Sequence, residues 1–175
     1  MGKVRKMLGK ADSPYILSMM RLIETQSKVT IATWCIDYSD EHFLPIYENA
    51  CPDDSRPRRA LEAGRAWLRK EIKLPEAKTA ILECHSAARE AESDPVIQAA
   101  ARTIGQAASS IHTPTHSLGL AFYGAAVFAY SRYGVDESAE FYDRIAAEVC
   151  GQMEASLRAV SVQDEPDPAR IKWYC

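Results

Sequence analysis

Histidines are the side chains of this sequence best suited to bind a metal ion. His112 and His116 are four residues apart, a spacing that places two side chains on one face of a helix. Because Pro114 lies between them, we expect His112 to precede a helix and His116 to lie in its first turn. There they could converge on a metal with His85 or Cys84, or they could simply bond backbone groups at the helix entrance. Spacing alone is weak support, so the metal site is an alternative hypothesis.

A basic run offers a second kind of chemistry, the recognition of acidic groups. Its members are Arg56, Arg58, Arg59, Arg65, Arg69 and Lys70. On a helix, Arg58, Arg65 and Arg69 fall along one side, so we expect them to contact an acidic protein partner or phosphates. The competing interpretation is a solvated helix face that is balanced by Glu62 and Glu71.

Arg56 stands at the expected start of this helix, where the helix dipole disfavours a cation. An arginine in that position is expected to have a specific carboxylate partner. Asp37, Asp40 and Glu41 are the candidates, so we predict a structural polar network of Asp37, Glu41 and Arg56. The same acids lie beside His42 and could serve acid–base chemistry or a metal, but no nucleophile is close in sequence.

Most catalytic fingerprints are absent from the sequence. It contains no Walker A loop, no G-x-G-x-x-G, no G-x-S-x-G, no H-E-x-x-H and no EF-hand loop. It also lacks the Glu-x-x-His pattern of di-iron helical bundles. We therefore predict no catalytic residues and no cofactor, and we favour a protein that is not an enzyme.

Composition describes one ordinary globular domain. The chain has 175 residues, of which 47% are hydrophobic and 26% charged, with a net charge of −3 and a pI near 5.8. Nothing in this balance favours nucleic acid or an anionic membrane. A helical array that binds nucleic acid through residues 56–70 stays open as a second alternative.

The cysteines and the apolar stretches point to a cytoplasmic protein. Five cysteines, an odd number, are widely spaced and form no C-x-x-C, so neither a disulfide framework nor a zinc finger is indicated. The longest apolar stretch, 118–130, is too short to cross a membrane. A reducing cytoplasm with no membrane attachment is therefore expected.

Prolines mark the helices that must position these side chains. Pro57, Pro75, Pro95 and Pro114 are 18, 20 and 19 residues apart, and each stands near the first turn of an apolar-periodic segment. Ser55, Asp94 and Thr113 are candidate N-caps. The predicted helices span 57–71, 75–91, 95–111, 114–132 and 136–160, preceded by a helix over 14–26 with Ser13 as its N-cap.

These elements predict an all-α fold, either a compact bundle or a short right-handed array of about seven helices. Residues 28–38 include β-branched side chains, but no partner strand exists elsewhere, so we predict helix there. The segment 114–132 is apolar nearly all round, which indicates a central helix. Trp34 and Trp67 are expected to be core anchors.

The domain organisation follows from composition along the chain. We expect a flexible basic arm over 1–12, a single helical domain over 13–162, and an extended C-terminal tail over 163–175. The apolar Trp173 and Tyr174 could dock on the body, and they leave room for a homodimer.

Several stretches of the middle of the chain resemble a known family. They are Trp34 with Asp37, Glu41–Glu48, the run R-P-R-R-A-L-E-A-G-R-A-W over 56–67, and Gly105–Ala108 leading to His112 and His116. Together, over roughly residues 30–130, they resemble the bacterial family of putative immunity proteins called immunity-protein-five-like. The resemblance implies a small, cytoplasmic, all-α protein that binds and neutralises a toxin from a neighbouring strain.

Overall fold

A computed structural model describes residues 4–173, and in that range it contains eight α-helices, one 3-10 turn and no strand. The helices are α1 (Pro14–Ile23), α2 (Lys28–His42), α3 (Leu44–Ala50), α4 (Arg56–Leu68), α5 (Leu74–Glu90), α6 (Pro95–Ser109), α7 (Leu118–Tyr133) and α8 (Ala139–Val160), with the 3-10 turn η1 (Pro114–Ser117) before α7. The predicted all-α class is confirmed. None of the helices in the described range is long and apolar enough to cross a membrane.

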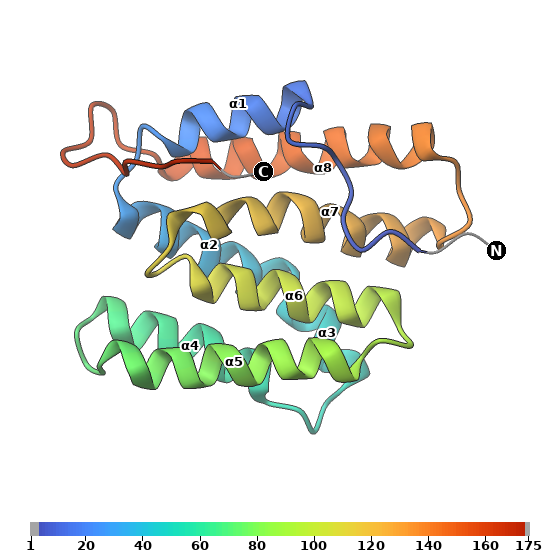
Figure 1. Ribbon diagram of the computed structural model, residues 1–175, viewed down its shortest axis with the longest axis horizontal. Coiled ribbons are helices and arrows are strands. Elements are labelled where there is room, and N and C mark those ends of the chain that lie inside the picture. The colour runs from blue at the N-terminus through green and yellow to red at the C-terminus, as the bar shows by residue number, and fades with distance from the viewer. Residues whose placement is uncertain (1–3, 174–175) are drawn as a thin grey trace.

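The helices form layers between two ends (Figure 1). Helices α1 and α8 lie together at one end, and α4 and α5 lie at the other. Between these ends, α6 packs against α7 and is also enclosed by α2, α3, α4 and α5. Helix α7, which forms most of the predicted central segment 114–132, is largely buried between α6 and α8, so that prediction is confirmed, and α6 is enclosed by still more helices. In α6, the buried Ala99, Ala100, Ala101, Ala107 and Ala108 let neighbouring helices approach closely.

Proline stands in the first turn of α4, α5, α6 and η1, as predicted. The side chain of Asp94 caps α6 by accepting from the N–H groups of Val96 and Ile97, both at 3.0 Å. Ser55 makes no such bond at the start of α4. Asp54 takes its place, because its carboxylate accepts from the N–H of Arg56 at 3.1 Å.

Residues 28–38 are helical, as predicted, although they include β-branched side chains. Ser27 caps α2 by accepting from the Thr30 N–H at 3.2 Å. Ile31 and Trp34 are buried on the inner side of α2, and the indole N–H of Trp34 donates to Ser156 of α8 at 3.2 Å. Burial of this face outweighs the weak local preference for strand. Trp67 is only half-buried.

The N-terminal segment runs across α7 (Figure 1). Its Leu8 is buried, and the Leu8 N–H donates to the carbonyl of Phe122 at 3.1 Å. The Tyr130 hydroxyl donates to the carbonyl of Arg5 at 2.6 Å. Residues 4–8 of the expected arm are therefore docked on the helical body in this structure, because an apolar side chain and two hydrogen bonds hold them there.

The C-terminal segment folds back onto the junction between α1 and α2 without forming a helix. The Ala169 N–H donates to the carbonyl of Gln26 at 2.7 Å. The side-chain amide of the buried Gln26 donates to the carbonyl of Val162 and accepts from the Val162 N–H. Glu165 bonds Ser27 and Thr30. The expectation for Tyr174 and Cys175 lies outside the described residues.

Candidate functional site

Arg56, the first arginine of the basic run, links the start of α4 to the end of α5. Its guanidinium donates to both oxygens of Asp54 at 2.9 and 2.7 Å, and to both oxygens of Glu90 at 2.9 and 2.6 Å. The Tyr47 hydroxyl also donates to Asp54, at 2.7 Å. The hydrogen bond from Arg56 is the main reason that the pKa of Asp54 falls to about 2.

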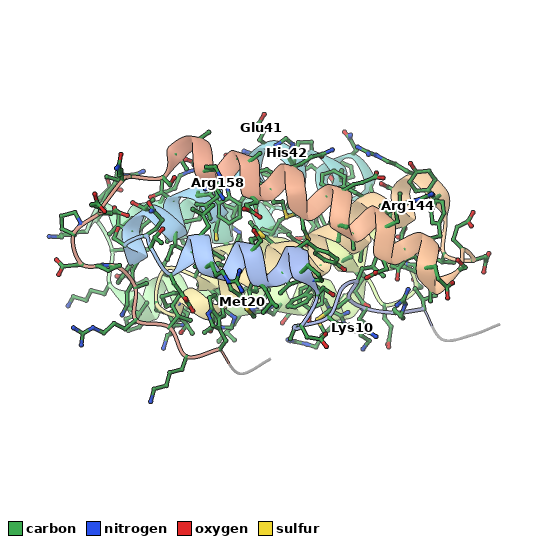
Figure 2. The ribbon with its side chains drawn as sticks, turned by 90° about the horizontal axis from the view of Figure 1, so that it is seen from above. Lys10, Met20, Glu41, His42, Arg144 and Arg158 are labelled. Atoms are coloured by element: carbon green, nitrogen blue, oxygen red, sulfur yellow. The ribbon has the colours of Figure 1, made fainter. Side chains whose placement is uncertain are left out.

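The predicted network of Asp37, Glu41 and Arg56 is therefore wrong in its pairing. Asp37 accepts from Arg65 instead, at 2.8 Å. Glu41 is exposed and lies 3.9 Å from the ring nitrogen Nε2 of His42. Figure 2 shows Glu41 and His42 together at the outer edge of the molecule. The prediction sought the partners of Arg56 among residues 37–41. The actual partners are Asp54, two residues before Arg56, and Glu90 of α5.

The three arginines predicted to bind a partner are each paired within the chain. Arg58 forms a two-bond fork with Glu48 of α3, at 2.6 and 2.7 Å. Arg65 bridges Asp37 and Asp40 of α2, with both distances 2.8 Å. Arg69 forms a fork with its neighbour Glu71, at 2.7 and 2.8 Å. Arg58 thus links α4 to α3, and Arg65 links α4 to α2.

Carboxylates outnumber arginines in these salt bridges. With Arg59, which pairs with Glu83 of α5 at 3.1 Å, five arginines of residues 56–69 meet seven carboxylates. The run looks basic in the sequence, but the fold surrounds it with acids from α2, α3 and α5. It therefore offers no net positive surface to phosphates, which weakens the nucleic-acid alternative.

The three candidate metal-binding histidines lie near one another between α5, α6 and η1. The ring of His85 covers Gly105 of α6 so closely that a side chain there would meet it at 2.7 Å. His116 Nδ1 lies 2.7 Å from the side-chain oxygen of Gln106. The rings of His112 and His116 have centroids 6.2 Å apart. Among the described residues, however, no three His, Cys, Asp or Glu side chains are placed to share a metal ion.

Burial keeps these histidines neutral. It lowers the pKa of His85, His112 and His116 below the usual value. For His112 and His85, the neighbouring cations Lys78 and Arg89 lower the pKa further. The Nδ1 atom of His112 is buried without a hydrogen-bond partner among the described residues. The cluster is a packed junction of three elements that resists protonation.

The buried cysteines have no nucleophilic character. Burial raises the pKa of Cys35, Cys84 and Cys150 to about 12. Since the thiolate is the reactive form, these thiols are inert at neutral pH. Neither the histidine cluster nor these cysteines therefore supplies a nucleophile with a base beside it.

A second surface was missed by sequence reasoning because its residues come from four separate segments. Two adjoining hollows, of about 310 and 260 Å³, lie where the N-terminal segment crosses α6 and α7. We call this surface the α6–α7 face, and its side chains used below are Arg5, Lys6, Met7, Glu92, Arg102, Phe122, Tyr123 and Trp173. No motif in the sequence joins these residues, so only the fold could reveal them.

Comparison with models of known protein families gives a match over most of the chain. A family model described as "Imm-5 like putative immunity protein" matches residues 21–156. No curated protein and no solved structure matches the chain. The matched range runs from the end of α1 into α8 and contains the whole arginine-rich helix α4.

Proposed function

Because this chain belongs to the family of Imm-5 like putative immunity proteins, we propose that it is a non-catalytic protein that binds a bacterial toxin and neutralises it. The family match over residues 21–156 is the observation that carries the proposal. It agrees with the resemblance carried by residues 30–130. A cytoplasmic location in a bacterium and a protein partner are parts of the same proposal.

The chemistry of the described side chains supports binding rather than catalysis. The buried thiols are protonated, the histidines of the cluster are neutral and packed, and the arginines of α4 are paired. A tightly packed body held by such pairs presents its surface in one shape. Preorganisation of this kind reduces the ordering cost of binding a partner.

Growth protection tests the proposal directly. Toxins encoded beside the gene are expressed one at a time in a sensitive bacterium, with this chain or with an unrelated helical protein as the control. We expect this chain alone to restore growth against one toxin and to form a stable complex with it in size-exclusion chromatography. If the chain protects against none of these toxins and forms a complex with none of them, the proposal is contradicted.

The mass of the toxin separates binding from enzymatic inactivation. After incubation with this chain, the intact toxin is measured by mass spectrometry, and an unchanged mass is expected of a binder. Protection should also persist with a chelator present, since the proposal needs no metal. Light scattering of the free chain reports whether it is a monomer or a homodimer before the toxin is added.

A further inference from the structure

Unpaired basic side chains set the α6–α7 face apart from α4. Arg5, Lys6 and Arg102 line the larger hollow, together with a single carboxylate, that of Glu92. None of these three cations forms a salt bridge with any described residue. In contrast to the arginines of α4, they leave a positive charge that an incoming group can use.

Aromatic and apolar side chains line the adjoining hollow. Met7 is 47% exposed, while Phe122, Tyr123 and Trp173 are half-buried around it. The guanidinium carbon of Arg102 lies 5.8 Å from the centre of the Tyr123 ring, so one cation–π pair joins the two hollows. Arginine and aromatic side chains next to a hollow are typical of the residues that dominate binding energy at protein interfaces.

The N-terminal segment that contributes to both hollows is held in place before any partner arrives. Its backbone is fixed at Arg5 by the Tyr130 hydroxyl and at Leu8 by the Phe122 carbonyl. The guanidinium carbon of Arg5 also lies 5.7 Å from the centre of the Tyr142 ring. The face is therefore a preformed surface, and little entropy is lost in arranging it.

We propose that the α6–α7 face docks an acidic segment of the toxin that carries one large apolar side chain. The carboxylates of the segment would meet Arg5, Lys6 and Arg102, and its apolar side chain would enter the hollow beside Met7 and Tyr123. This inference rests on the proposed function and adds to it the location and the chemistry of the interface.

Charge complementarity decides between an acidic protein and other partners. A basic segment would place its cations against Arg5, Lys6 and Arg102, and the larger hollow offers it only the carboxylate of Glu92. Asp136 and Glu137 line a separate hollow, which Arg5 also borders. Nucleic acid also carries negative charge and stacks on aromatic rings, but strong binding to it rests on many phosphate contacts. The face offers only three cations on a chain of net charge −3, which suits a short acidic protein segment better.

Selection from a random-peptide display library tests the binding preference of the α6–α7 face without the toxin. Twelve-residue peptides are selected on the full chain, and the enriched peptides are measured by fluorescence anisotropy against wild type and variants. We expect enrichment of acidic peptides that contain a large apolar or aromatic residue. Arg102→Glu and Met7→Asp should each weaken binding about tenfold or more. Both sites are at the surface, and circular dichroism confirms that the variants are folded.

Arg69→Glu is the matched control, because it makes the same charge reversal on the opposite end of the fold and should leave peptide affinity within about twofold. Enrichment of basic peptides, no enrichment at all, or binding insensitive to Arg102→Glu and Met7→Asp would overturn the inference. Salt-sensitive binding of single-stranded oligonucleotides that displaces the peptides would assign the face to nucleic acid and overturn it as well.

The growth assay distinguishes failure of this inference from failure of the proposed function. If wild type protects against a toxin and both variants protect equally, the interface lies elsewhere and the function stands. If no toxin is neutralised while the acidic peptides still bind wild type and lose affinity for the variants, the face is a docking surface for a different acidic partner.

Discussion

Removing the carboxylate of Glu165 should loosen the C-terminal segment from the start of α2. This carboxylate accepts three hydrogen bonds, from the Ser27 N–H at 2.7 Å, the Ser27 hydroxyl at 2.9 Å and the Thr30 hydroxyl at 2.5 Å. It also sits at the N-terminus of a 15-residue helix, where the dipole favours a negative charge. Glu165→Gln keeps the shape of the side chain but replaces one acceptor oxygen by a donor and removes the charge.

The size of the effect follows from the setting of these bonds. Hydrogen bonds to charged groups contribute about 1.5–3 kcal/mol each when buried, but the three bonds share one carboxylate that is partly exposed to water. We expect Glu165→Gln to lower the free energy of unfolding at pH 7 by about 1.5 kcal/mol. For a chain of this length, that loss corresponds to a fall in Tm of roughly 3–6 °C.

The pH dependence of the difference provides an internal check. Burial alone would raise the pKa of Glu165, but the bonds from Thr30 and Ser27 outweigh it and hold the pKa below its usual value. A carboxylate with a lowered pKa stabilises the fold above the unfolded pKa of about 4.3 and loses this contribution as the pH falls through the folded value. The difference between wild type and Glu165→Gln should therefore shrink below about pH 4.3.

Urea denaturation at several pH values measures this difference. Asp164→Asn is the matched control, since it removes one negative charge from the adjacent residue and asparagine tolerates its left-handed backbone, with φ of 51°. We expect the control to stay within about 0.5 kcal/mol of wild type. Equal stabilities of Glu165→Gln and Asp164→Asn at pH 7 would refute the reasoning.

Three further changes test other parts of the fold by thermal or urea denaturation. Arg56→Lys should lower the free energy of unfolding by about 1–2 kcal/mol, because lysine cannot form both carboxylate forks. The exposed Arg69→Lys should leave the Tm unchanged, and equal effects of the two variants would contradict the role of Arg56 in joining α4 to α5. Gly151→Ala has open space around the added carbon and should stabilise by about 1 kcal/mol, whereas Gly124→Ala would meet neighbouring side chains at 2.6–2.7 Å and should destabilise by about 1–3 kcal/mol. The free energy of unfolding should fall as the pH drops below about 6.5, because buried histidines with a lowered pKa bind protons more readily when the chain is unfolded. His116→Gln should reduce the slope of this free energy against pH by at most about 1.4 kcal/mol per pH unit, and an unchanged slope would show that His116 titrates alike in both states.

Local signals were sufficient to predict where most helices begin. Proline in a first turn and Asp94 at an N-cap act within a few residues, so the sequence shows them directly. Helix α8, which the sequence predicted over 136–160, buries side chains from Tyr142 to Leu157, whereas Val160 at its end is exposed. Apolar content located the central helix α7, but it did not show that α6 is enclosed by more helices, because that depends on the close approach that alanine permits.

Pairing of charges was beyond the sequence because it depends on tertiary structure. The partners of Arg58, Arg59 and Arg65 come from α3, α5 and α2, between 10 and 28 residues away. A run that reads as a basic face on one helix is therefore neutralised by carboxylates that only folding brings to it. The α6–α7 face shows the converse, since Arg102 is an isolated cation in sequence and becomes part of a positive hollow when residues 4–6 pack beside it.

The arginines of α4 and the α6–α7 face lie differently with respect to the range that the family model matches. The arginines of α4 lie inside the matched range of 21–156, and the fold uses them to hold α4 against α2, α3 and α5. Arg5, Lys6, Met7 and Trp173 of the α6–α7 face lie outside that range, whereas its Glu92, Arg102, Phe122 and Tyr123 lie inside it. Under the proposed function, members of the family would neutralise different toxins, and their interfaces would then have to differ. Exchanging these terminal segments between members should therefore change partner choice while the helical body stays intact.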